Sequence, residues 1–162
     1  MRETIVDRAY AKTLLPPRKE DGHKGDFGKL LVLGGSVGYT GAPYLAASAA
    51  VHSGCGLVYL GVPESIWAVE AQKCVSAMPF PLPETDGRLC LAALDKMQDK
   101  LKGCDVLALG PGLGRGKETE QLVHALLWQV KEPLVLDADG LNALQGLSLI
   151  HISEPTRLRR IS

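Results

Sequence analysis

Short apolar runs alternate with longer helical patterns through most of this chain. The runs are Lys29–Leu33, Leu57–Val62, Asp105–Leu109 and Pro133–Leu136. Apolar runs of this length, bounded by glycine, proline or polar residues, are typical of buried strands. Because a helical stretch follows each of the first three runs, the strands must be joined by crossover connections, which produce parallel pairing. The sequence therefore predicts an α/β fold: a doubly wound, mainly parallel sheet with helices on both faces.

The intervening segments carry the helical patterns. The predicted helices are Ala42–His52, Glu64–Lys73, Leu91–Leu101 and Lys117–Val130. In the second of these, Ile66 and Val69, with Trp67 beside them, recur at helical spacing and are expected to face the core. The segment Val75–Pro83 is expected to be extended and interrupted by its prolines, and Asp86-Gly87 predicts a turn. No internal repeat or linker divides the chain.

Composition excludes several classes of function. With 162 residues, 46% of them hydrophobic, the chain is expected to form one domain with a buried core. Its 18 basic residues equal its 18 acidic residues, which argues against binding to nucleic acid or an anionic membrane through bulk charge. The longest apolar stretches, such as Leu45–Val51, are shorter than the roughly 20 residues of a transmembrane helix, and Met1–Tyr10 is no signal peptide. We expect a cytoplasmic protein.

Neither cysteine nor histidine spacing indicates a metal site. The four cysteines, Cys55, Cys74, Cys90 and Cys104, include no C-x-x-C pair, so free and mostly buried thiols are expected. The histidines show no H-E-x-x-H spacing. His52 is expected to cap its helix and His124 to be structural. A metal held by the protein alone is therefore not expected.

The segment Leu147–Ser162 differs from the rest of the chain in composition. It reads LSLIHISEPTRLRRIS, which contains three arginines and no capped helix or bounded strand. The string resembles the in-frame translation of a transposon-end adapter used in sequencing libraries. We therefore expect residues 147–162 to be non-native and residues 1–146 to be part of a longer domain; the alternative is a genuine basic terminus.

A glycine-rich loop, GGSVGYTGA, runs from Gly34 to Ala42 after the first apolar run. Glycines between a buried strand and a helix let the backbone approach a phosphate or ribose, and the helix N-terminus presents free N–H groups. We take Gly38, Gly41 and Ala42 as candidate binding residues. The loop matches neither the P-loop nor the G-x-G-x-x-G fingerprint. The alternative is a tight strand-to-helix turn.

Two further loops follow the third and fourth runs. GPGLG supplies the candidates Gly110, Gly112 and Gly114, because clustered glycines indicate close backbone approach or positive φ. DADGLN places Asp137 at a strand end and Asn142 at the start of a helix. These side chains could orient a hydroxyl, a water or a nucleotide-bound Mg²⁺.

Plainer roles remain open for parts of these motifs. The alternative to a binding role for DADGLN is that Asp139 or a neighbour caps a helix. Lys24 lies in H-K-G-D-F-G before the first run, where it could contact a phosphate or remain a solvated turn residue.

The chain resembles the NAD(P)H-hydrate dehydratase family in four motifs that occur in order: H-K-G-D-F-G, G-G-S-V-G-Y-T-G-A, G-P-G-L-G and D-A-D-G-L-N. The match covers roughly Leu14 to Leu144. The resemblance implies a ribokinase-like fold and an enzyme that repairs hydrated NADH or NADPH. Such enzymes phosphorylate the ring hydroxyl with ADP, or with ATP in eukaryotes, and phosphate then leaves to give NAD(P)H.

The resemblance also assigns roles to residues. Ala42 and the glycine loop before it, with Gly38 and Gly41, would line the hydrated dinucleotide, as would Gly112 between Gly110 and Gly114. Asp137 and Asn142 would stand in the nucleotide and Mg²⁺ region. The resemblance also implies a homo-oligomer at full length. It further implies an NAD(P)H-hydrate epimerase as a separate partner or a fused domain.

One part of the family pattern is missing. The T-P-H-P-G-E-like segment, a lysine-containing nucleotide strand and the G-T-G-D loop with the catalytic aspartate are expected beyond Gly146. The chain alone is therefore expected to lack turnover and to be poorly soluble. The alternatives are another ribokinase-like small-molecule kinase and a non-catalytic nucleotide-binding module.

Overall fold

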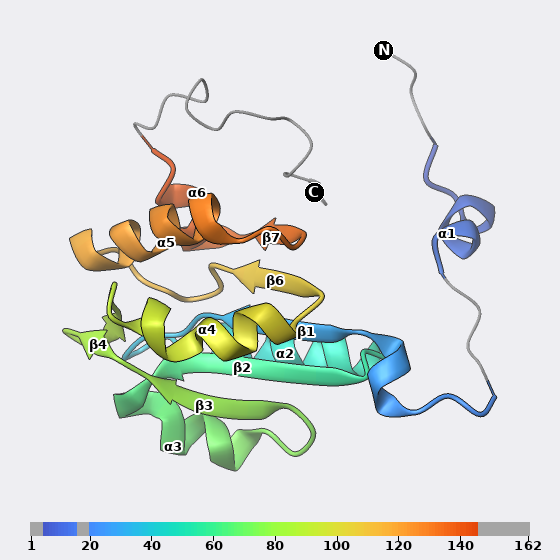
Figure 1. Ribbon diagram of the computed structural model, residues 1–162, viewed down its shortest axis with the longest axis horizontal. Coiled ribbons are helices and arrows are strands. Elements are labelled where there is room, and N and C mark those ends of the chain that lie inside the picture. The colour runs from blue at the N-terminus through green and yellow to red at the C-terminus, as the bar shows by residue number, and fades with distance from the viewer. Residues whose placement is uncertain (1–4, 16–19, 146–162) are drawn as a thin grey trace.

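A five-stranded parallel sheet forms the centre of the molecule, with strand order β3-β2-β1-β6-β7 (Figure 1). The computed structural model describes residues 5–15 and 20–145. The strands are β1 (Lys29–Leu33), β2 (Leu57–Pro63), β3 (Met78–Leu82), β6 (Val106–Leu109) and β7 (Leu134–Leu136). All four pairings between neighbours are parallel, which confirms the predicted α/β fold. The predicted tail, residues 147–162, lies outside the described residues.

Helices precede, connect and follow the strands in the described part of the chain. They are α1 (Arg8–Leu14), η1 (Lys24–Phe27), α2 (Gly41–His52), α3 (Glu64–Lys73), α4 (Ala93–Gly103), α5 (Lys117–Gln129) and α6 (Ala138–Asn142). The prediction of four main helices is confirmed, with ends that differ by at most two residues. A two-stranded antiparallel hairpin, β4 (Glu84–Thr85) and β5 (Arg88–Leu89), lies between β3 and α4.

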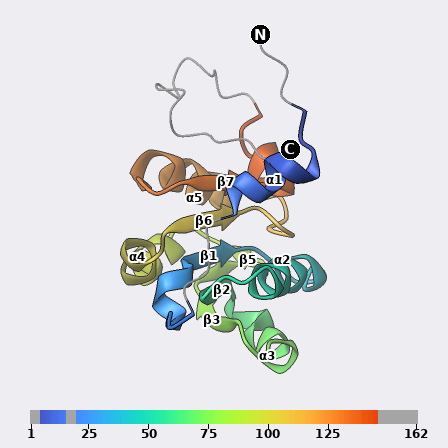
Figure 2. The ribbon, with the colours of Figure 1, turned by 90° about the vertical axis from the view of Figure 1, so that its right-hand side faces the viewer.

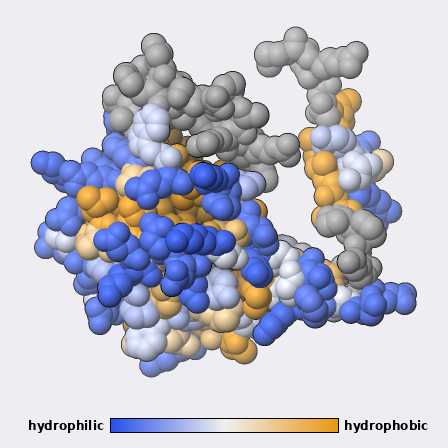
Figure 3. Space-filling view, viewed as in Figure 1, coloured by the Kyte–Doolittle hydropathy of each residue, from blue (hydrophilic) through white to orange (hydrophobic). Residues whose placement is uncertain are grey.

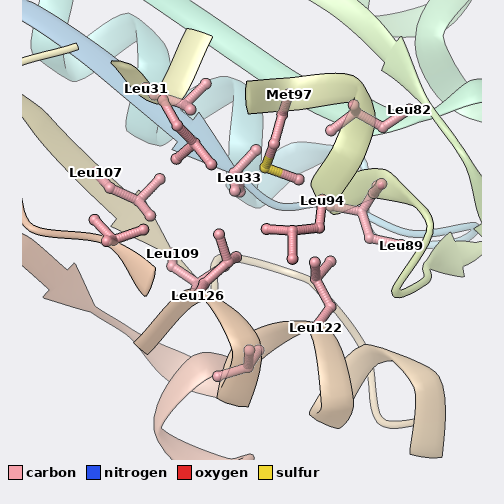
Figure 4. Packing of buried hydrophobic residues seen from close by; sticks show 14 of the residues in the cluster. Leu31, Leu33, Leu82, Leu89, Leu94, Met97, Leu107, Leu109, Leu122 and Leu126 are labelled. Atoms are coloured by element: carbon pink, nitrogen blue, oxygen red, sulfur yellow. The ribbon is translucent and has the colours of Figure 1, made fainter. Parts of the chain in front are cut away.

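The helices cover both faces of the sheet. Figure 2 shows α2 and α3 on one side and α4 and α5 on the other. The alternation of side chains along β1 produces this arrangement, because Leu31 and Leu33 point to one face and Val32 to the other. The face of Leu31 and Leu33, which α4 and α5 cover, holds the larger core. Figure 4 shows Leu33 of the sheet, Met97 of α4 and Leu122 of α5 in this core.

Strand register brings three chain segments to one edge of the sheet. Leu33 of β1 pairs with Leu109 of β6, and Leu109 pairs in turn with Leu136 of β7. The residues that follow these partners, including Gly34 and Gly110, therefore leave the sheet at the same level. The three predicted loops thus begin side by side.

The predicted inner face of α3 is wrong in part. Ile66 is buried, but Trp67 and Val69 are 41% and 44% exposed. The buried position one turn beyond Ile66 is Glu70, which is fully covered. The hydrophobic pattern missed it because a glutamate is almost never fully buried unless it is paired.

The strand β3 forms one edge of the sheet and pairs only with β2 among the described strands. It was expected to be extended and interrupted by prolines, and it contains Pro79 and Pro81. A proline lacks the N–H group that a further strand would need, so prolines are tolerated at a sheet edge and discourage edge-to-edge pairing.

The first helix, α1, buries none of its residues. Figure 3 shows hydrophobic surface on this helix, to which Leu14 contributes at 63% exposure. None of the helices in the described part of the chain combines the length and the apolar character that a bilayer span requires.

The core position of Leu107 gives a direct test of this packing. Leu107 of β6 is fully buried in the larger core, whereas Leu45 on α2 is 65% exposed. We expect Leu107→Ala to reduce the free energy of unfolding by about 2–5 kcal/mol, because the removed side chain leaves a cavity. The matched change Leu45→Ala should cost less than about 0.5 kcal/mol. Urea unfolding followed by circular dichroism measures both, and equal losses would contradict the assigned core.

Candidate functional site

The first two glycine loops are held together at the carboxyl ends of β1 and β6. Gly35 N donates a hydrogen bond to the Pro111 carbonyl over 2.8 Å. Ser36 Oγ donates to the Gly112 carbonyl, also over 2.8 Å. A Cβ added at Gly112 would lie 3.4 Å from the Cβ of Ala42. The structure therefore brings together Ala42 and Gly112, two candidate residues from separate strand-end loops.

Gly38 and Gly41 lie on the exposed side of the first loop. Gly38 has φ +89° in a turn that is closed by a 2.9 Å hydrogen bond from Tyr39 N to the Ser36 carbonyl. Positive φ at this turn position is the conformation that favours glycine. Gly41 begins α2, and the preceding Thr40 forms no side-chain capping bond. The first turn of α2 thus presents its N–H groups at the edge of the sheet.

Gly110 and Gly114 join the second loop to the third. Gly110 has φ +133°, and a Cβ there would collide with the carbonyl of Asp137 and lie 2.9 Å from Gly140 N. Gly114 has φ +73°, and its N–H donates to Asp139 Oδ2 over 3.0 Å. Gly110 is therefore needed for close approach of the two backbones, whereas Gly114 is favoured by its positive φ.

The third loop differs from its prediction. Asn142 is the last residue of α6, not the start of a helix, because α6 begins at Ala138 directly after β7. Asn142 Nδ2 donates to Asp139 Oδ1 over 3.0 Å. Asp139 therefore joins Asn142 to the second loop instead of capping a helix. Asp137 occupies the N-cap position without a side-chain capping bond, and its carboxylate is exposed.

A pocket of about 160 Å³ opens beside the junction of the second and third loops. Its wall includes Gly114, Asp139 and Asn142. Arg115 and Glu120, both exposed, add charges of opposite sign. The candidate residues therefore fall into two groups: those around Ala42 and Gly112, and those around this pocket. The side chain of Asp137 lines neither.

The β4–β5 hairpin supports the same edge and was not assigned to the site from the sequence. Val37 N donates to the Gly87 carbonyl over 2.9 Å, and Ser36 forms a bridge with Arg88. Asp86 and Gly87 have φ of +51° and +72°. An Asp-Gly pair with two positive φ angles is the usual two-residue hairpin turn. The predicted Asp86-Gly87 turn therefore carried the signal for this hairpin.

Other singled-out residues lie elsewhere. Lys24 is in η1, which precedes β1 and packs against Gly56, at the end of the sheet opposite the glycine loops. His52 Nδ1 lies 2.7 Å from the Ser48 carbonyl, within the last turns of α2. His124 Nε2 lies 2.7 Å from the Ala143 carbonyl. These contacts fit structural roles for both histidines.

All four cysteines are free thiols. Cys90 and Cys104 are buried, whereas Cys55 and Cys74 are half-buried, so the expectation of mostly buried thiols holds for two of them. Burial raises the pKa of the Cys104 thiol, and the charge of Glu132 raises it further. Within the described ranges, no three His, Cys, Asp or Glu side chains gather as a metal ion would require.

Comparison with known protein families shows which family has this sequence. The family model described as NAD(P)H-hydrate dehydratase matches residues 30–157, which is more than half of the chain. This chain belongs to the NAD(P)H-hydrate dehydratase family. The match includes all three strand-end loops, and the family resemblance read from the sequence is thereby confirmed.

Two curated relatives show how much of the family's length is represented. The bifunctional NAD(P)H-hydrate repair enzyme of Moorella thermoacetica is 46% identical over 86% of this chain, which covers 27% of that protein. The ATP-dependent (S)-NAD(P)H-hydrate dehydratase of Drosophila melanogaster is 34% identical over 88% of this chain and 47% of that protein. The chain therefore spans between about a quarter and a half of these relatives.

A solved structure supports the ribokinase-like fold of the family. The ADP/ATP-dependent NAD(P)H-hydrate dehydratase of Bacillus subtilis, crystallised with ATP and Mg²⁺, superimposes with a TM-score of 0.62. It is 27% identical to this chain, and the alignment covers 82% of this chain and 45% of that one. The parallel sheet described above is thus the family's fold.

Asp139 should stabilise the dehydratase-family loops measurably. Its carboxylate accepts hydrogen bonds from Gly114 N and Asn142 Nδ2. We expect Asp139→Ala to reduce the free energy of unfolding by about 1–3 kcal/mol, because both donors lose their acceptor. Asp137→Ala, which removes an exposed carboxylate two residues away, should cost less than about 0.5 kcal/mol. Thermal unfolding compares the two, and similar losses would show that Asp139 does not join the loops.

Gly110 provides a second test of the same junction. Alanine at this position would place a methyl group against the Asp137 carbonyl at a φ of +133°. We expect Gly110→Ala to cost about 3 kcal/mol or more, from steric overlap and backbone strain together. Gly41→Ala enters open space at the start of α2 and should change stability by less than about 1 kcal/mol. Tolerance of Gly110→Ala in urea unfolding would contradict the close approach.

Proposed function

We propose that this chain supplies the hydrated-dinucleotide-binding part of a nucleotide-dependent NAD(P)H-hydrate dehydratase. The observation that carries the proposal is the meeting of Ala42 and Gly112 at the carboxyl edge of the sheet, where open α/β sheets bind their ligands. Family membership supports the substrate class, because the relatives named above are NAD(P)H-hydrate dehydratases or repair enzymes.

Backbone groups would provide most of the binding. Gly38, Gly41 and Ala42 surround the N-terminus of α2, where N–H groups and the helix dipole favour an anionic group such as a pyrophosphate. Gly112, flanked by Gly110 and Gly114, would contact the dinucleotide from the other loop. Because Ala42 and Gly112 carry little or no side chain, the ligand can approach the main chain closely.

The reaction proposed for the complete enzyme is dehydration driven by phosphoryl transfer. The ring hydroxyl of hydrated NADH or NADPH takes a phosphoryl group from ADP or ATP, which releases AMP or ADP and the hydroxyl proton. Phosphate then leaves and the ring loses a proton from the neighbouring carbon, which restores the double bond of NAD(P)H. Donors around the phosphoryl group would stabilise its developing charge. The catalytic residues are expected beyond Gly146, so the chain alone is proposed to bind substrate without turning it over.

The described residues fit Mg²⁺ only as a partner of the nucleotide. Both oxygens of Asp139 already accept hydrogen bonds, whereas the Asp137 carboxylate is exposed. Mg²⁺ in nucleotide sites is bound through one or two carboxylates together with substrate phosphates and water. Asp137 would therefore be the protein ligand, and Asn142, at the end of α6, would face the nucleotide from the pocket that it lines. The ion would neutralise phosphate charge there.

The remaining proposals concern assembly and location. An NAD(P)H-hydrate epimerase is proposed as partner or fused domain, and the bifunctional repair enzyme of Moorella thermoacetica supports this idea. Homo-oligomerisation of the complete protein stays a prediction from the sequence resemblance. A cytoplasmic location is proposed because the four free thiols fit a reducing compartment.

Ala42 offers a test that does not depend on turnover. It is exposed in the first turn of α2, so Ala42→Leu should place a bulky side chain in the ligand surface without disturbing the core. We expect titration calorimetry to give at least about tenfold weaker binding of hydrated NADPH, which corresponds to about 1.4 kcal/mol. Ala49→Leu, exposed on the same helix, is the matched control.

The same titrations contain the outcomes that would overturn the proposal. If Ala42→Leu and the unaltered chain bind hydrated NADPH with equal affinity, this edge of the sheet is not the substrate site. Binding of ATP without any binding of hydrated NADPH would favour a different ribokinase-like kinase. Recovery of NADPH by the chain with ATP or ADP would contradict the expected position of the catalytic residues.

A further inference from the structure

A buried glutamate lies beneath the outer surface of α3. Glu70 has no exposed surface, and its Oε2 atom has no hydrogen-bond partner. Its Oε1 atom lies 3.0 Å from Lys73 Nζ, one helical turn away. Buried side chains with an unpartnered polar atom are rare in folded proteins and require a specific explanation.

The partner of this glutamate reaches a second element. Lys73 Nζ also donates to the carbonyl of Thr40 over 2.9 Å. Thr40 is the N-cap residue of α2, immediately before Gly41 and Ala42. The ammonium group therefore connects a buried charge on α3 to the main chain at the start of α2.

Stability alone gives a poor account of this arrangement. A cation beside a helix N-terminus is disfavoured by the helix dipole, which prefers anions there. A buried ion pair also loses much of its attraction to desolvation, and apolar residues of similar volume often serve as well. The ion pair and the hydrogen bond do, however, restrict where the Thr40 carbonyl can lie. Glu70 is fully buried, its carboxylate holds the Lys73 ammonium group, and that ammonium group binds the carbonyl.

The Cys74 thiol lies at the end of α3, beside Glu70 and Lys73. Burial raises the pKa of the Cys74 thiol, the charge of Glu70 raises it further, and Lys73 lowers it. Glu70 and Lys73 therefore both lie close to Cys74 at the end of α3, where they shift its pKa in opposite directions.

We propose that Lys73, held by Glu70, is a positioning residue that fixes the start of α2 for the substrate. Glu70 confines the ammonium group, the ammonium group fixes the Thr40 carbonyl, and Thr40 sets the direction of the N–H groups that follow it. The substrate in question rests on the proposed function. The restraint on α2 does not, because it operates in the unliganded chain.

Hydrogen exchange on the unliganded 162-residue chain tests the restraint directly. In Lys73→Met, which keeps the aliphatic stem, amides in the first two turns of α2 should exchange about tenfold faster while those of β1 and β6 keep their rates. Lys73→Arg keeps a donor and should restore most of the protection. Lys96→Met removes an exposed lysine from α4 and is the matched control.

A second variant separates positioning from simple loss of an ion partner. Lys73→Met leaves Glu70 as an uncompensated buried charge, which is destabilising. The double variant Glu70→Met with Lys73→Met removes both charges and should recover the unfolding midpoint. Exchange at the start of α2 should remain fast in it, because the Thr40 carbonyl still lacks its donor. Recovery of both stability and protection would overturn the proposal.

Ligand titration then links the restraint to the substrate. We expect the double variant to bind hydrated NADPH about tenfold more weakly than the unaltered chain, with Lys96→Met unchanged. If exchange accelerates while affinity stays constant, the restraint does not serve the substrate and the proposal is overturned. If the unaltered chain binds no hydrated NADPH, the proposed function fails, and the exchange data still decide whether Lys73 fixes α2.

Discussion

The in-register pairing of β1, β6 and β7 is the constraint on which the site depends. Leu33, Leu109 and Leu136 lie at equivalent positions along neighbouring strands, so the chain leaves all three strands at one level. Burial of alternating leucines on one face of β1 and β6 specifies this register, because a shift by one residue would turn those side chains to the other face. The core therefore determines which loops can meet.

Once aligned, the loops are joined mainly through backbone atoms. Gly35 binds the Pro111 carbonyl, Gly110 packs on the Asp137 carbonyl, and Gly114 N binds the Asp139 side chain. These approaches are too close for a Cβ or need positive φ, which explains glycines in two loops by geometry before any ligand is considered. Gly38 and Gly41 lie outside this crowded region, because nothing lies within 4 Å of a Cβ at either position.

The sequence predicted those parts of the structure that depend on local pattern. Apolar runs such as Lys29–Leu33 predicted the strands, because a short buried run has few alternatives. Glu70 could not be predicted as a buried residue, because the residues that cover it are brought there by the tertiary fold, although its partner Lys73 lies only three residues away on the same helix. Likewise, Arg88 and Ser36 meet through a hairpin contact that sequence spacing does not contain, although Asp86-Gly87 marked the turn. Resemblance to the family, not periodicity, brought Ala42 and Gly112 together.

A site built from main-chain groups needs its helix held in place by other means. The Asp139 side chain joins the second and third loops, but α2 starts at Thr40, where no side-chain cap forms. At this helix start no side-chain oxygen of Thr40 accepts from the first-turn N–H groups, and the ammonium group of Lys73 on α3 instead donates to the Thr40 carbonyl. This leaves the first-turn N–H groups unblocked by a capping oxygen, which an anionic ligand requires. The start of α2 can therefore be held through the Thr40 carbonyl while its first-turn N–H groups stay open to a ligand.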